Sequence, residues 1–158
     1  MTADDPERRR FSEAVGAGMY ETDWAAQHLG IRLEEIRPGY ARTAMTVAET
    51  MLNSQGSCHG GLIFTLADAA FGYACNAENK ATVALACSIS FTSAARPGER
   101  LTAVAEERLR NARTGTYDIT VTGGDGRTVA LFRGSSYQIK GETVPGLGAG
   151  PRKAAEET

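Results

Sequence analysis

A glycine pair and a single carboxylate share the most apolar stretch of the chain, CHGGLIFTLADAAFGYACN, which runs from Cys58 to Asn76. Asp68 is the only formally charged side chain between Glu49 and Glu78. A carboxylate in apolar surroundings is costly unless it is paired, protonated or functional. Pairing with an arginine from a strand is the structural interpretation. A general base or a nucleophile is the catalytic one.

The glycine pair Gly60-Gly61 opens this apolar run. Glycines at a helix start allow a ligand to approach the backbone closely, because no Cβ intervenes. The first N–H groups of a helix have no intrahelical partner and lie at the positive end of the helix dipole. They can therefore hold a phosphate or polarise a carbonyl, although a tight turn into a buried helix is the plainer interpretation.

Three neighbours of the glycine pair also admit two interpretations each. His59 is a helix cap or a group that contacts substrate, and Asn53 is a loop residue of an Asx turn or a polar ligand. Cys58 offers a thiol nucleophile, but residues adjacent in sequence rarely pair correctly, and a buried inert thiol is favoured.

Distance separates the two main candidates. Gly61 and Asp68 are seven residues apart, which is about 10 Å along a helix that rises ~1.5 Å per residue. A carbonyl held at the Gly61 N–H cannot also touch Asp68 of the same chain. If both groups act on one substrate, the carboxylate must come from a neighbouring subunit, and the site lies at a dimer interface.

The elements that position these groups follow from capping and periodicity. Asp5-Pro6 starts a helix that Gly16 and Gly18 are expected to end, and a short helix follows over residues 24–29. The patterns then predict two strands over residues 31–37 and 40–48, a helix over 60–77 that is apolar around nearly its whole circumference, and four strands in a meander.

This order predicts an α+β fold, with an antiparallel sheet wrapped around one long helix. Residues 1–140 form a single domain that includes the short N-terminal helices. Residues 141–158 contain much Gly and Pro and few apolar residues, and are predicted to be a disordered tail. One sheet of this size leaves an edge and a face to cover, and self-association is a common way to cover them.

Composition narrows the function classes. The chain has 158 residues, a net charge of −2, three cysteines and two histidines. These values predict no nucleic-acid partner, and no cofactor or metal site. No apolar run reaches the roughly 20 residues of a membrane span, and the N-terminus has no apolar signal core. We therefore expect a cytoplasmic protein with reduced thiols and no membrane partner.

The assembled residues resemble those of the hotdog-fold acyl-CoA thioesterases, and more narrowly of the phenylacetic-acid-pathway (PaaI-type) phenylacetyl-CoA thioesterases. The resemblance is carried by MLNSQGSCHGGLIFTLADAAFGYACN, SISF, RPGERLTA, RTGTYDITV and RTVALFRGSS. It covers roughly residues 29–140. It implies a hotdog fold, subunits paired edge to edge, and pairs that associate further into tetramers.

The resemblance also implies roles for individual residues. Asp68 attacks the thioester or activates water across the interface, the Gly61 backbone polarises the carbonyl, and His59 and Asn53 position the reacting groups. Contacts to substrate and to coenzyme A, which is part of the substrate and not a cofactor, are implied for Gly60, Phe91, Arg96, Arg110, Arg113 and Thr114.

The leading hypothesis is thus hydrolysis of phenylacetyl-CoA, or of a hydroxylated relative, to free acid and CoA. Two alternatives remain open. One is a hydroxyacyl-thioester dehydratase of the same fold, which needs a histidine and a carboxylate that act together. The other is a protein that binds acyl-CoA without turning it over.

Overall fold

The computed structural model describes residues 5–152 and contains three α-helices and six strands. The helices are α1 (Pro6–Glu21), α2 (Trp24–His28) and α3 (Gly60–Asn76), and a single 3₁₀ turn spans Glu49–Met51. The strands are β1 (Arg32–Arg37), β2 (Tyr40–Thr46), β3 (Lys80–Phe91), β4 (Arg100–Asn111), β5 (Thr114–Thr122) and β6 (Thr128–Glu142).

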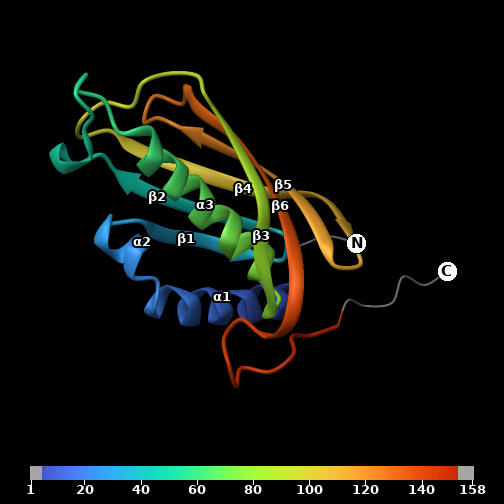
Figure 1. The fold of residues 1–158 in the computed structure, drawn as a ribbon. Helices are drawn as coiled ribbons and strands as arrows, with labels where there is room; N and C mark the ends of the chain where they lie inside the picture. The colour runs from blue at the N-terminus through green and yellow to red at the C-terminus, as the bar shows by residue number, and fades with distance from the viewer. Residues whose placement is uncertain (1–4, 153–158) are drawn as a thin grey trace.

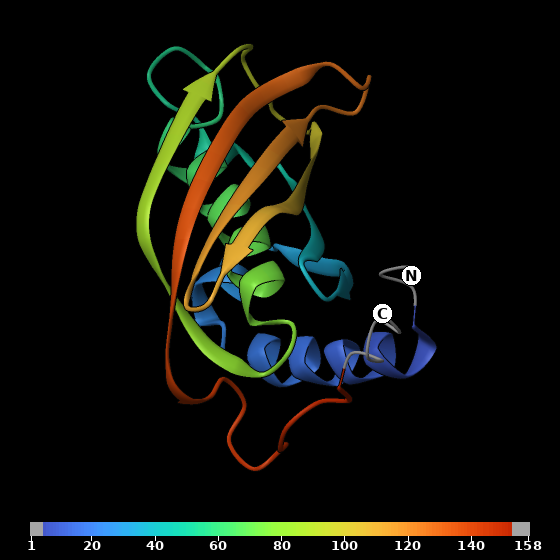
Figure 2. The same cartoon turned by 90° about the vertical axis from the view of Figure 1, so that its right-hand side faces the viewer.

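The six strands form one antiparallel sheet in the order β1-β2-β4-β5-β6-β3. The sheet curves around α3, which lies in its concave face, while α1 lies beyond the β1 side (Figures 1 and 2). The predicted α+β architecture, a hotdog fold with one long central helix, is confirmed.

The core lies between α3 and the inner face of the sheet. Alternate residues of β5 are buried, and the Tyr117 ring lies tilted against the Phe71 ring of α3, with 5.5 Å between the ring centroids. Gly134 of β6 leaves room for the same Phe71 ring, because a Cβ there would come within 2.8 Å of it. Close approach of helix and sheet therefore depends on a small residue in β6 as well as on the apolar residues of α3.

The expected meander of four strands is only partly correct. β4, β5 and β6 are consecutive neighbours, but β3 pairs with β6 and forms the far edge of the sheet. The connection 92–99 therefore crosses the end of the sheet to reach β4. Its Ala95 carbonyl accepts a 2.9 Å hydrogen bond from the Cys58 amide, which ties this connection to the loop before α3.

Helix α1 is longer than the sequence predicts, because it continues through both glycines that were expected to end it. A Cβ at Gly16 would come within 2.7 Å of the Leu33 side chain, and one at Gly18 within 2.8 Å of the Val144 side chain. Both glycines therefore serve close packing, which outweighs their low helix propensity.

The segment that follows β6 returns along α1. Val144 lies against Gly18, and Gly150 lies against Phe11 near the other end of that helix. Asn79 fastens the segment, because its side chain donates to the Val144 and Gly148 carbonyls and accepts from the Val144 amide. The disorder expected beyond residue 140 stays a prediction, and its last six residues lie outside the described range.

Three features bear on the function classes. No helix within residues 5–152 has the length and apolarity needed to cross a membrane. The same residues hold no cluster of three His, Cys, Asp or Glu side chains that could bind a metal ion. All three cysteines are free thiols.

Candidate active site

The start of α3 is organised around the His59 side chain. His59 is the N-cap residue, and its Nδ1 accepts a hydrogen bond of 3.4 Å from the Gly61 amide. This bond requires a neutral imidazole with its proton on Nε2. The bond is long, and both residues are exposed, so the Gly61 N–H is only weakly engaged and stays within reach of a ligand.

Asn53 adopts the Asx turn that was the structural interpretation of this residue. Its Oδ1 accepts hydrogen bonds from the Gln55 amide at 2.9 Å and the Ser57 amide at 3.2 Å. The His59 amide in turn donates to the Met51 carbonyl, which holds this loop against the helix start. The Asn53 Nδ2 group has no partner within residues 5–152 and keeps two donors for a ligand.

Phe91, at the end of β3, closes one side of the helix start. Its ring lies over Gly60, where a Cβ would come within 3.0 Å of the ring. Arg96 is exposed on the neighbouring connection, which the bond between Cys58 and Ala95 joins to the same loop. The structure thus places Asn53, His59, Gly60, Gly61 and Phe91 at the start of α3, with Arg96 on the adjoining connection.

Cys58 is an unsuitable nucleophile. Its side chain is 4% exposed, and its thiol lies 3.7 Å from the His59 carbonyl. Burial raises the pKa of the thiol above its ordinary value, so the reactive thiolate is scarce at neutral pH. The structure favours the inert thiol that the sequence suggested.

Asp68 does not lie inside its own chain. It is exposed on a stripe of α3 that also carries Gly61, Thr65 and Gly72, so the prediction of a helix apolar on nearly every side is wrong for this stripe. Within residues 5–152 no arginine or other group pairs with its carboxylate. The structural interpretation of Asp68 as half of an internal ion pair is therefore excluded for these residues.

A second carboxylate, which the sequence did not connect with the site, acts on Asp68. Asp23 caps α2 by accepting from the Ala26 amide, and its other oxygen accepts a 2.9 Å hydrogen bond from the Tyr73 hydroxyl. Loss of hydration, and then the negative charge of Asp23, raise the pKa of the Asp68 carboxyl. In the sequence, Asp23 is recognisable only as a helix cap, and that pattern does not indicate an effect on the pKa of Asp68.

We expect Asp23→Asn to move the acid limb of the activity profile to lower pH. Hydrolysis that needs an ionised Asp68 rises as pH passes through its pKa, and removal of a neighbouring negative charge lowers that pKa. Asparagine keeps the helix cap through its Oδ1, while its Nδ2 takes the place of the oxygen that accepts from Tyr73 and can donate to the Tyr73 hydroxyl oxygen instead. The measurement is kcat/KM against pH for both proteins, and an acid limb that stays in place or moves upward contradicts the coupling.

The remaining predicted contacts lie at the other end of α3. Arg110 donates a 2.6 Å hydrogen bond to Glu78, which follows the last residue of the helix by two positions. Arg113 and Thr114 are exposed at the turn between β4 and β5. The helix has 17 residues, or about 25 Å at ~1.5 Å per residue. One chain therefore does not gather all the predicted site residues.

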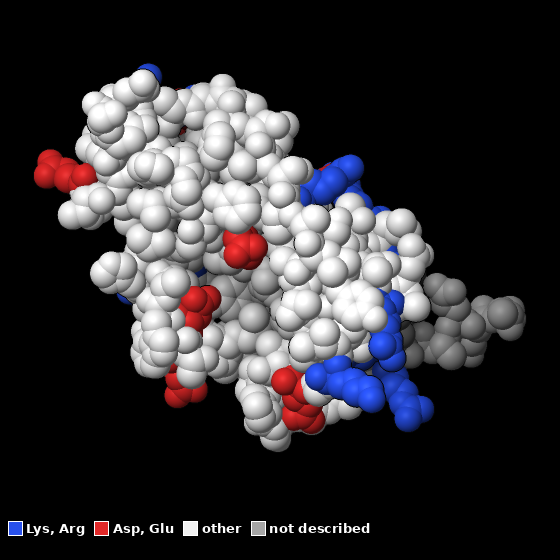
Figure 3. All heavy atoms as spheres, viewed as in Figure 1, with Lys and Arg blue, Asp and Glu red and all other residues white. Residues whose placement is uncertain are grey.

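The face that carries α3 and β3 is largely uncharged, with a few acidic groups within it and basic groups along one edge (Figure 3). On β3, Val83, Leu85 and Phe91 are 45%, 61% and 53% exposed. Among the described residues, no strand lies on the outer side of β3. Apolar side chains and an unpaired strand edge together favour coverage by another chain.

Comparison with known proteins gives the family. Residues 55–130 match the thioesterase superfamily model. The chain is 48% identical over 128 residues to the acyl-coenzyme A thioesterase PaaI of Escherichia coli strain K12, with 81% of this chain and 91% of that protein covered. The chain is an acyl-CoA thioesterase of the PaaI type. It is therefore a thioester hydrolase, and its six-stranded sheet around α3 is the hotdog fold of this family.

Solved structures agree with this PaaI-type assignment. The E. coli PaaI protein from the phenylacetic acid degradation operon superposes with a TM-score of 0.84 at 44% identity, over 85% of this thioesterase and 98% of that chain. A hypothetical thioesterase of Streptococcus pneumoniae with coenzyme A has a TM-score of 0.67 at 27% identity, over 71% and 90% of the respective chains.

Proposed function

We propose that this thioesterase hydrolyses phenylacetyl-CoA, or a hydroxyphenylacetyl-CoA, to the free acid and CoA. One observation carries the proposal: helix α3 presents both a weakly engaged N–H group, at Gly61, and an exposed carboxylate without a partner among the described residues, at Asp68. The acyl group is inferred from similarity to the E. coli protein of the phenylacetic acid degradation operon. Phe91 beside Gly60 supplies an aromatic wall for it.

The start of α3 polarises the thioester. The carbonyl oxygen takes the place of His59 Nδ1 as acceptor of the Gly61 N–H, at the positive end of the helix dipole. As the carbonyl is attacked, negative charge grows on this oxygen, and the N–H group stabilises it. The displaced imidazole and the Asn53 amide keep donors with which to orient the thioester or the attacking water.

Asp68 of the neighbouring subunit drives the attack. As a general base it takes a proton from water, whose oxygen bonds to the carbonyl carbon, and the C–S bond then breaks to release the CoA thiolate. As a nucleophile it bonds to the carbonyl carbon and the C–S bond breaks, which releases the CoA thiolate and leaves a mixed anhydride that water then cleaves to the free acid and the Asp68 carboxylate. Both routes need an ionised carboxylate near the carbonyl.

The partner subunit follows from the same geometry. Gly61 and Asp68 of one helix are about 10 Å apart, whereas two α3 helices side by side and antiparallel bring Gly61 of one beside Asp68 of the other. Two β3 edges pair at the same time, which covers Leu85 and completes a continuous sheet. We further propose that such pairs associate as a dimer of dimers, and that the enzyme works in the cytoplasm.

We expect Leu85→Lys to separate the subunits and to lower activity at least about tenfold, because a charge on an edge strand opposes strand pairing. Leu85 is 61% exposed within its own chain, so folding is not expected to suffer. The measurements are molar mass by light scattering and the rate of thiol release at the same protein concentration.

Leu109→Lys is the matched control, since Leu109 is 57% exposed but lies on β4, away from the sheet edge. It should leave both the pair of subunits and the activity in place. A monomeric Leu85→Lys protein with full activity would show that the site does not need a second subunit.

The dehydratase alternative is less well supported by this site. The nearest histidine to the exposed carboxylate along α3 is its N-cap residue, His59, which engages Gly61. The deciding experiment is a screen of aryl and aliphatic acyl-CoAs with two readouts, free thiol and enoyl product. Thiol release fastest from aryl-acetyl thioesters supports the proposal. Enoyl product supports the dehydratase, and stoichiometric binding without either product supports a binding protein.

A further inference from the structure

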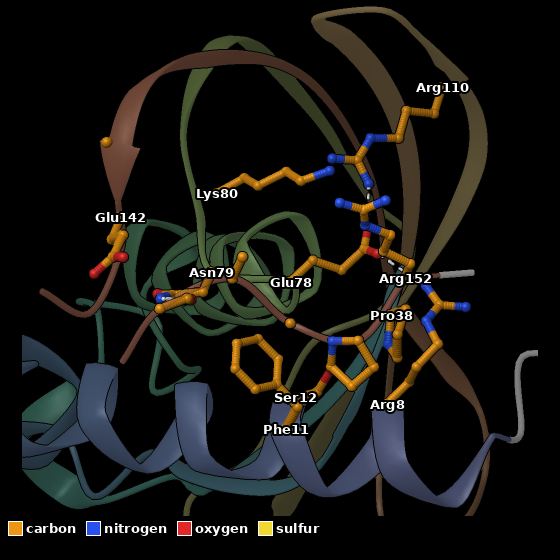
Figure 4. A pocket seen from close by; sticks show the side chains of 15 residues that line it. Arg8, Phe11, Ser12, Pro38, Glu78, Asn79, Lys80, Arg110, Glu142 and Arg152 are labelled. Carbon is orange, nitrogen blue, oxygen red and sulfur yellow. Dashed lines mark hydrogen bonds and ion pairs between the residues drawn. The ribbon is translucent and has the colours of Figure 1, made fainter. Parts of the chain in front are cut away.

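A cavity of about 610 Å³ lies at the end of α3 that is remote from Gly61. Its walls come from α1, from the residues between α3 and β3, from the end of β4 and from the segment after β6 (Figure 4). Two of these walls, α1 and the segment after β6, lie outside the residues that match the thioesterase superfamily model. The family model therefore covers only part of the cavity lining.

One wall of the cavity is a three-residue ion cluster. Arg8 of α1 and Arg110 of β4 donate to the two carboxylate oxygens of Glu78, at 2.8 and 2.6 Å. Burial alone would raise the pKa of Glu78, but the hydrogen bonds from Arg110 and Arg8 hold it below its ordinary value. Glu78 is therefore ionised, and it fixes both guanidinium groups in place.

The cluster leaves hydrogen-bond donors unused. A guanidinium has five N–H donors, and each of the two arginines gives one hydrogen bond to Glu78. Neither has a further hydrogen-bond or ion-pair partner within residues 5–152, although the charge of Glu107 also acts on Arg110. Two arginines share one carboxylate, so the cluster alone keeps an excess positive charge.

Two further cations line the cavity without any ion pair. Lys80, the first residue of β3, and Arg152 have no side-chain partner among the described residues. Figure 4 shows Lys80 and Arg110 extending toward one another from different strands, with Glu78 and Arg152 beside them. The other lining carboxylate, Glu142, lies on the opposite side of the view and accepts a 2.7 Å hydrogen bond from the Gly146 amide.

The lining matches a phosphate ester better than a bare anion. Four cations face two carboxylates, and one of these carboxylates is engaged with the backbone. Phe11, Pro38 and Pro151 add apolar surface. Ligand cavities of several hundred Å³ typically bury drug-sized molecules, so the space accepts an organic group attached to the phosphate.

We propose that this cavity binds the phosphate groups of a nucleotide through Lys80, Arg152, Arg110 and Arg8. Guanidinium groups match phosphate oxygens through paired hydrogen bonds, and the lysine adds a point charge. In this proposal, α1 and the segment after β6 form two walls of the binding site. The Glu78 carboxylate acts as a positioning residue for the two arginines.

The nucleotide has two possible sources, either free in solution or as the end of the coenzyme A thioester. The second source rests on the proposed function. Asp68 lies eight residues before Asn76, the last residue of α3, which is about 12 Å at ~1.5 Å per residue, and Glu78 follows Asn76 by two residues. A coenzyme A thioester whose carbonyl lies beside Asp68 therefore has to lie along the second half of that same α3 helix, so that its nucleotide end reaches the cavity.

The test uses the double variant Lys80→Gln/Arg152→Gln, which removes two cations without breaking the Glu78 cluster. The matched control is Arg10→Gln/Arg32→Gln, which removes two exposed cations elsewhere. The probe is adenosine 3′,5′-bisphosphate, with adenosine as the uncharged comparison, and the readout is Kd by calorimetry. We expect the Lys80/Arg152 variant to bind the bisphosphate at least about tenfold more weakly than wild type, and the control to bind it as wild type does.

Kinetics then distinguish the sources. If the nucleotide belongs to the substrate, the Lys80/Arg152 variant raises KM for phenylacetyl-CoA about tenfold at unchanged kcat and leaves phenylacetyl-pantetheine unaffected. If the nucleotide is a free ligand, binding of the bisphosphate weakens while both KM values stay the same.

The proposal is overturned if wild type binds the bisphosphate no more tightly than adenosine, or if the Lys80/Arg152 variant binds it as well as wild type. Calorimetry decides this even if no acyl-CoA is hydrolysed. Failure of the proposed function and failure of the nucleotide site are therefore separate outcomes.

Discussion

Asp68→Asn is expected to lower kcat/KM for acyl-CoA hydrolysis by roughly a thousandfold, the scale of losing a general base or nucleophile. Asparagine keeps the size of the side chain but cannot take a proton or attack the carbonyl. Asp68 is exposed and has no partner within residues 5–152. The free energy of unfolding of the separate chain should therefore change by no more than about 0.5 kcal/mol. Thiol release and denaturant unfolding measure the two effects.

Glu21→Gln is a suitable control, because Glu21 is another exposed acid, at the end of α1 and outside the site. It should leave kcat/KM unchanged. An Asp68→Asn protein that assembles normally and keeps wild-type hydrolysis would remove Asp68 from the mechanism.

Gly61→Pro is expected to lower kcat by about a hundredfold to a thousandfold, the range seen when one donor to a developing oxyanion is removed. Proline deletes the N–H group that the mechanism assigns to the carbonyl. The first turn of a helix tolerates proline, since its N–H groups have no intrahelical partner. The hydrogen bond that is lost within the chain is the long one to His59.

Gly61→Ala separates the missing donor from the added bulk. A Cβ at this position would lie 3.7 Å from His59 Nδ1, which is an ordinary contact, and alanine keeps the N–H. It should retain most of the activity. Equal losses for alanine and proline would point to crowding and not to the N–H group.

Mixing the two inactive proteins tests whether the site is shared. In a mixed pair, an Asp68→Asn chain supplies the intact Gly61 and a Gly61→Pro chain supplies the intact Asp68, so one of two sites is complete. Random exchange of equal amounts makes half of the pairs mixed, so about a quarter of wild-type activity should return. No recovery after confirmed subunit exchange would place both groups of each site in one chain.

Local sequence signals were sufficient for the helix that carries the site. The Gly-Gly start and the apolar run predicted a helix over residues 60–77, and the structure has Gly60–Asn76. Two other predictions failed because packing decided them. The glycines of α1 meet Leu33 and Val144, and β3 pairs with β6 at the sheet edge. Such contacts join residues far apart in sequence, which periodicity does not reveal.

Sequence patterns also left out part of the geometry of the candidate site. The sequence singled out His59, Gly61 and Asp68 as candidates and offered a helix cap as one interpretation of His59. It did not tell which helix N–H the imidazole accepts from, because this depends on a side-chain rotamer. The influence of Asp23 on Asp68 was missed for a different reason. Asp23 belongs to another helix, and its capping role fully explained its presence in the sequence.

The exposure of Asp68 in the separate chain has a consequence for biosynthesis. A newly made chain folds with this carboxylate still exposed on its surface, and so meets only part of the cost of dehydrating a charge during folding. Under the shared-site mechanism, dehydration comes later, when a second chain covers the stripe, and the same event supplies the N–H group that the carboxylate needs. Single subunits would then not hydrolyse acyl-CoA. The turnover number per chain would fall on dilution, because the pairs of subunits dissociate.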